Sequence, residues 1–136
     1  MASDIQPDLV LRGGTVIDGT GAPGFTADVA VGDGRILAVG DLRGVRAARE
    51  IDAAGRAVAP GFIDVHTHDD LACLTNPDMV AKVSQGVTSV VVGNCGISAA
   101  PLRFADGVEE PFNLLGALGD FRYPDFAAYR AAVERV

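Results

Sequence analysis

Residues 62–92 carry strand, helix and strand signals in that order, and this order constrains the fold more than any other feature. Phe62–His68 alternates in character as a strand does, and Val87–Val92 is a nearly continuous β-branched run, typical of a strand covered on both faces. Between them, Asn76 is placed to cap a helix, Pro77 to open it and Gly86 to follow its end. Such a unit requires parallel strands, which predicts the α/β class.

The chain before Ala57 follows a different pattern, in which short apolar stretches alternate with glycine. The dipeptide Asp33-Gly34 suits the positive φ angles of a tight hairpin turn. We expect a small antiparallel β unit with strands at Leu9–Leu11, Thr15–Ile17, Asp28–Val31, Arg35–Val39 and Glu50–Ala53. The change of pattern predicts two domains, residues 1–57 and residues 58–136.

The segment after the second strand, Gly93–Tyr123, is irregular and rich in glycine and proline. Pro124 then predicts the start of a last helix, on which Phe126, Tyr129 and Val133 recur at helical spacing. Connections as long as Gly93–Tyr123 are uncommon in compact domains and are often functional.

Bulk composition excludes several classes of partner. The net charge is −7 and no Lys/Arg run exists, which argues against nucleic acid. No apolar stretch is long enough for a membrane span, and the start lacks a secretory signal, so we expect a cytoplasmic protein. Two cysteines in such a chain favour metal ligation or burial over a disulfide framework.

His66 and His68 are the residues most suggestive of chemistry. They lie two apart on a strand, so their side chains are expected on one face, with Cα atoms roughly 6.6 Å apart. Imidazoles at that separation can converge on one metal ion, although two histidines at a strand end can also be incidental. We expect Asp64 on the same face, and Ile63, Val65 and Thr67 packed on the other.

Cys95 follows the second strand directly, within Gly93-Asn94-Cys95-Gly96. Parallel strands would place it at the same edge as His68. A lone cysteine is more often a small buried apolar residue, but its place beside the two histidines favours ligation. A thiolate suits zinc.

Three further polar residues are open to two interpretations, and two other residues are expected to have no part in the chemistry. Asp69 and Asp70 either orient the histidines or are ordinary loop acids. Asn94 either forms a hydrogen bond near the metal or simply turns the chain. Cys73 is expected to pack, and Lys82 to be a solvated residue on the outer face of its helix.

Several motifs together resemble one known family. Pro60–His68 is similar to the first barrel strand of the amidohydrolases, whose two histidines bind the metal. Gly93–Gly96, which places a cysteine where most two-metal amidohydrolases rely on a carboxylated lysine, resembles the N-acyl-D-amino-acid deacylases of that superfamily. The strand exit His66–Asp70 and the opening Gly13–Gly21 are similar to the same enzymes.

The resemblance implies the start of a metal-dependent (β/α)8 TIM-like barrel, preceded by part of a small β-sandwich. A whole barrel needs roughly 250 residues, so this one would be incomplete. It also implies one or two Zn²⁺ ions held by His66, His68 and Cys95, and hydrolysis of N-acyl-D-amino acids. The general base and the other ligands are then expected beyond Val136, in the remainder of the enzyme or another copy, so no catalytic base is expected in this chain.

Two alternatives stay open. One is an amidohydrolase of the hydantoinase or dihydroorotase type, against which Cys95 argues. The other is a non-catalytic fragment that needs a second chain to complete its site. For the deacylase, we expect the segment after Cys95 to cover part of the substrate pocket, with Ile97 and Pro101 on the inner wall.

Overall fold

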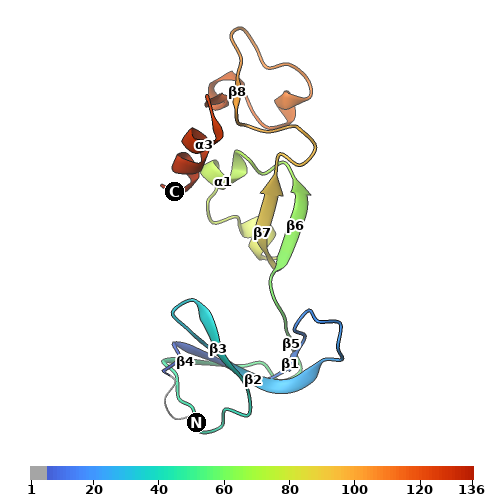
Figure 1. Ribbon diagram of the computed structural model, residues 1–136, viewed down its shortest axis with the longest axis vertical. Coiled ribbons are helices and arrows are strands. Elements are labelled where there is room, and N and C mark those ends of the chain that lie inside the picture. Colours follow the sequence, from blue (N-terminus) through green and yellow to red (C-terminus); the bar gives the residue numbers. More distant parts are fainter. Residues whose placement is uncertain (1–5) are drawn as a thin grey trace. The chain divides into compact units, whose positions relative to one another are not determined.

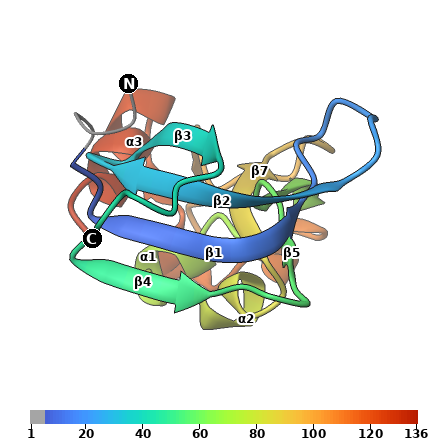
Figure 2. The ribbon, with the colours of Figure 1, turned by 90° about the horizontal axis from the view of Figure 1, so that it is seen from below.

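The first of two structural units runs to Pro60 and is built on one five-stranded sheet (Figure 2). A computed structural model describes residues 6–136. The strands are β1 (Leu9–Val16), β2 (Phe25–Gly32), β3 (Arg35–Gly40), β4 (Arg49–Asp52) and β5 (Ala57–Val58). Their order is β3-β2-β1-β4, and β5 pairs with the far end of β1.

The hairpin between β2 and β3 confirms the predicted turn, with φ of 50° at Asp33 and 68° at Gly34. β1 differs from the prediction, because it is one strand rather than two. Its pairing with β2 shifts between Leu11 and Gly14, where a β-bulge inserts an extra residue. Gly13, at φ 65°, allows the bend. The glycine pair therefore deforms a continuous strand and does not end it.

The sheet is mixed, which corrects the expectation of a wholly antiparallel unit. β2 runs antiparallel to β1 and β3, but β4 and β5 both run parallel to β1. Because Ala57–Val58 pairs with β1, the first unit extends to Pro60 and the second begins at Gly61. The boundary therefore lies at residues 60/61 and not, as expected, at 57/58.

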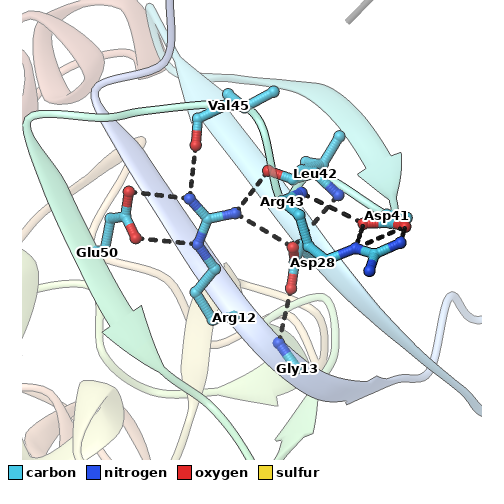
Figure 3. A network of polar contacts seen from close by, with 8 residues as sticks. All are labelled: Arg12, Gly13, Asp28, Asp41, Leu42, Arg43, Val45 and Glu50. Carbon is cyan, nitrogen blue, oxygen red and sulfur yellow. Dashed lines mark hydrogen bonds and ion pairs between the residues drawn. The ribbon is translucent and has the colours of Figure 1, made fainter.

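Arg12 joins β1, β2, β4 and the loop after β3 (Figure 3). Its guanidinium donates to Asp28 at 3.1 Å and to both carboxylate oxygens of Glu50, at 2.8 and 3.0 Å. It also donates to the carbonyl oxygens of Leu42, at 2.8 Å, and Val45, at 2.6 Å. Arg12 of β1 thus holds β2, β4 and the loop after β3 together.

The Asp28 carboxylate is held in its ionised form. Burial alone would raise the pKa of Asp28, but hydrogen bonds from the Gly13 N–H, Arg12 and the Leu42 N–H outweigh it and lower the pKa below 3.8. A depressed folded-state pKa stabilises the fold at pH values above the unfolded pKa. This contribution is lost as the pH falls through the folded-state value.

The second unit begins with two parallel strands, β6 (Phe62–Thr67) and β7 (Val87–Val92), which lie side by side and point the same way (Figure 1). Their parallel pairing confirms the predicted strand–helix–strand unit and the mixed α/β class. The remaining elements are α1 (Ala72–Thr75), α2 (Val80–Val83), β8 (Leu102–Arg103), the 3-10 helices η1 (Phe112–Leu114) and η2 (Leu118–Asp120), β9 (Arg122–Tyr123) and α3 (Phe126–Val133).

The predicted helix after Asn76 is wrong in its start, because two short helices flank that position. Asn76 is the C-cap of α1, with an extended φ of −140°, as expected for a residue that precedes proline. Met79, at φ 44°, then precedes α2, so Pro77 lies in the turn between the helices. Gly86, at φ 80°, follows the end of α2 as predicted.

The last helix, α3, confirms the prediction with a start two residues after Pro124. The carboxylate of Asp125 caps it by accepting from the Ala128 N–H at 2.8 Å. Tyr129 of α3 is buried in the core of this unit, together with Leu71, Ala99, Ala100 and Tyr123. Over residues 6–136, no helix combines the length and apolar character needed to cross a bilayer.

We predict that Arg12→Met destabilises the first unit by roughly 2–3 kcal/mol. The substitution keeps an apolar stem but removes the side-chain donor and countercharge of the part-buried Asp28 carboxylate and the Arg12 donors to two carbonyl groups. The free energy of unfolding from urea denaturation measures the effect.

Arg43→Met is the matched control. It removes a guanidinium of the same kind whose pair with Asp41 is exposed, with side-chain exposures of 89% and 60%, so little change is expected. Equal losses for Arg12→Met and Arg43→Met would show that the Arg12 network adds nothing beyond surface charge.

Candidate metal centre

The parallel pairing of β6 with β7 brings three candidate ligands to one edge of the sheet. His66 lies near the C-terminal end of β6 and His68 just beyond it, while Cys95 follows the end of β7. Parallel strands end at the same edge, so residues 27 positions apart in the chain meet there.

The three side chains converge. One donor atom from each of His66, His68 and Cys95 lies within 4.8 Å of the other two. The Cys95 Sγ is 3.8 Å from the His68 Nε2, and the two imidazole rings meet edge to face with centroids 5.8 Å apart. All three residues are exposed. Two imidazoles and a thiol form a donor set that fits zinc, whose tetrahedral sites take nitrogen and sulfur ligands.

A β-bulge in β6 includes His66, the first of the two histidines. Asp64 pairs opposite Val90 and Thr67 opposite Val92, so Val65 and His66 together oppose the single residue between. The extra residue turns Asp64 and Thr67 to the same side of β6, where both contact one ammonium group. The expectation that Asp64 shares the histidine face, opposite Thr67, is therefore wrong.

That ammonium group belongs to Lys82, which is not the solvated residue that was expected. Its Nζ lies 2.7 Å from Asp64 Oδ2, 2.9 Å from Asp69 Oδ2 and 3.1 Å from Thr67 Oγ1. Hydrogen bonds to Asp64 and Asp69 raise the pKa of Lys82. The bond from Lys82, followed by the His66 N–H, lowers the pKa of Asp64.

Asp69 and Asp70 have different surroundings. Asp69 accepts from the Thr67 hydroxyl and pairs with Lys82, so it belongs to the polar cluster beside the strand exit. Asp70 is fully buried and accepts from the Ala99 N–H at 2.9 Å, while its carbonyl accepts from the Tyr129 hydroxyl at 2.8 Å. Among the described residues its Oδ2 has no partner. Asp70 thus joins the β6 exit to the segment after Cys95.

Asn94 links the two strand ends directly. Its side-chain Nδ2 donates to the carbonyl oxygen of Val65 at 2.5 Å. Val65 precedes His66 and Asn94 precedes Cys95, so this one bond connects the two halves of the site. Of its two interpretations, a hydrogen bond near the candidate ligands agrees with the geometry.

Cys73 and the segment after Cys95 show no comparable convergence. Cys73 is half-buried, and burial, together with the charges of Asp69 and Asp70, raises the pKa of its thiol. A thiol in that environment is inert, in agreement with a packing role. Ile97 is half-buried and Pro101 is exposed, and their predicted place on a substrate pocket stays a prediction.

A model of the amidohydrolase family matches residues 49–135, more than half of the chain. The chain therefore belongs to the amidohydrolase family. It is similar to D-aminoacylase of Alcaligenes xylosoxydans xylosoxydans, with 52% identity over 96% of this chain and 27% of the relative. An N-acyl-D-glutamate deacylase of that organism is 51% identical over 93% of this chain and 26% of the relative. The chain thus spans about a quarter of the length of these relatives.

Solved structures show the same similarity. A crystal structure of D-aminoacylase superposes with a TM-score of 0.88 at 56% identity, over 93% of this chain and 26% of that one. The N-acyl-D-glutamate deacylase from Bordetella bronchiseptica, complexed with zinc and a phosphonate inhibitor, superposes with a TM-score of 0.87 at 48% identity, over 96% and 27%. The chain therefore shares the fold of part of these enzymes.

We predict that Asp70→Ala destabilises the second unit by about 1–3 kcal/mol, because the buried Ala99 N–H loses its acceptor. The free energy of unfolding is the measurement, with Asp106→Ala, at an exposed position, as the control. Asp70 contacts the segment after Cys95 and not the candidate ligands. The metal content of the Asp70→Ala variant should therefore equal that of the parent. Loss of metal at full stability would instead assign Asp70 to the metal site.

Proposed function

We propose that this chain is part of a zinc-dependent deacylase that hydrolyses the amide bond of N-acyl-D-amino acids. The products are a carboxylate and a free D-amino acid. The convergence of His66, His68 and Cys95 carries the proposal. It occurs in a chain that is 52% identical to a D-aminoacylase.

The proposal includes a larger architecture. In it, β6 and β7 are the first strands of a (β/α)8 barrel, and β1–β5 form part of a small β-sandwich. The C-terminal ends of barrel strands carry reactive groups in such enzymes, and the three candidate ligands lie at those ends of β6 and β7. In this proposal, the further ligands and the general base would lie outside these 136 residues.

The chain's own residues would serve as ligands. The imidazoles of His66 and His68 and the thiolate of Cys95 would hold one or two Zn²⁺ ions. When bound, zinc would polarise the acyl carbonyl and lower the pKa of a bound water toward about 7. The zinc-bound structure of the Bordetella bronchiseptica enzyme supports the choice of metal. A cytoplasmic location stays a prediction from the sequence.

Activity is the direct test of the proposal. The full-length enzyme carrying this chain should release free amino acid from N-acetyl-D-amino acids, and little from the L-enantiomers, as measured by enantioselective chromatography. Ring opening of hydantoin or dihydroorotate, without hydrolysis of N-acetyl-D-amino acids, would overturn the proposal in favour of the cyclic-amide alternative.

Metal content separates the two cysteines. We predict that Cys95→Ala in the full-length enzyme loses most of its zinc and its activity together, because a methyl group cannot donate to a metal. Cys73→Ala should keep both, since Cys73 only packs. Elemental analysis after dialysis measures the zinc. Full zinc content in Cys95→Ala would show that this thiol is not a ligand.

A further inference from the structure

The β6 bulge frees two backbone groups beside the candidate ligands. Over the paired stretch of β6, neither Val65 nor His66 has a pairing partner in β7. A bulge leaves its extra residue unpaired and disrupts the ladder locally. The carbonyl of Val65 and the N–H of His66 therefore need partners from elsewhere.

Side chains supply both partners. Asp64 Oδ1 accepts from the His66 N–H at 3.2 Å, and Asn94 Nδ2 donates to the Val65 carbonyl at 2.5 Å. The first bond comes from β6 itself and the second from the loop that carries Cys95. Both backbone groups freed by the bulge therefore have hydrogen-bond partners.

The acceptor in the first bond is itself held in place. Asp64 offers one carboxylate oxygen to His66 and the other to Lys82. Lys82 is the only lysine of the chain, and its side chain is 26% exposed. Through Asp69 and Thr67, the same ammonium group also binds the two residues that flank His68. One side chain of α2 therefore fixes the strand on both sides of the histidine pair.

We propose that Asp64, Lys82 and Asn94, here called the bulge clamp, are positioning residues that set the spacing between the histidine pair and Cys95. This proposal rests on the metal site of the proposed function. Among the described residues the three candidate ligands are exposed, so packing within this part of the enzyme does not hold them. The bulge clamp takes that role, because Asn94 joins the backbone before His66 to the residue before Cys95.

The proposal predicts a loss of metal affinity without a loss of fold. Asn94→Ala and Lys82→Met keep every candidate ligand. The first removes the hydrogen bond to the Val65 carbonyl, and the second removes the ammonium group that holds Asp64. Substituting a residue that orients metal ligands typically lowers metal affinity or activity about 10–100-fold. In the full-length enzyme we expect zinc affinity, measured by competition with a chromophoric chelator, to fall by that factor. Lys82→Arg keeps the charge and should retain most of the affinity.

Cobalt substitution gives a readout that a merely structural role would not move. With Co²⁺ in place of zinc, the visible bands and the thiolate charge-transfer band report ligand geometry. We expect both to shift in Asn94→Ala and Lys82→Met. Matched controls in the same unit are Asn113→Ala, an exposed amide, and Arg130→Met, which breaks the exposed pair with Glu134. Both should keep parental affinity and spectra.

Each outcome decides a different claim. If the parent binds no metal, both the proposed function and the bulge clamp fail. If the parent binds metal and both folded variants match its affinity and cobalt spectrum, only the bulge clamp fails. Should Lys82→Met not fold by circular dichroism, the decision passes to Asn94→Ala, which removes a single bond at an exposed residue.

Discussion

The parallel pairing of β6 with β7 is the constraint on which the site depends. His68 and Cys95 are 27 residues apart in the chain, and this pairing is what brings their strand ends together. With it, the ends of two neighbouring strands place all three donors within 4.8 Å of each other. The rest of the second unit supports this pairing. The short helices complete the connection between the strands, and the bonds of Asp70 to Ala99 and Tyr129 fix the chain beyond each strand end.

The sequence predicted those parts that depend on local patterns. Both strands, their parallel direction and the convergence of the three candidate ligands followed from residue alternation, an unbroken β-branched run and the rule that parallel strands end at one edge. The turn at Asp33-Gly34 also followed, because its positive φ angles need particular residue types. In each case the physical cause lies within a few residues of the structure that it determines.

The features that the sequence did not predict depend on contacts between distant segments. The β6 bulge arises from the register against β7, and a one-residue slip moves a side chain to the opposite face. Asp64 and Thr67 were therefore expected on opposite faces of β6, although both contact Lys82. Lys82 was taken as solvated because its partners depend on where α2 begins. That start was misread, since Asn76 serves equally well as an N-cap or as the residue that ends a helix before proline.

The two units share one arrangement at their bulges. In β1 the freed Gly13 N–H donates to Asp28, which Arg12 holds, and in β6 the His66 N–H donates to Asp64, which Lys82 holds. In both, an aspartate accepts from the freed N–H, and this bond together with the bond from a cation lowers the pKa of the aspartate. The difference is what the bulge carries. In β1 the bulge consists of Arg12 and Gly13 and carries no candidate ligand, so the network stabilises the sheet. In β6 it carries a candidate ligand, so the same kind of network also determines where the donor atoms lie.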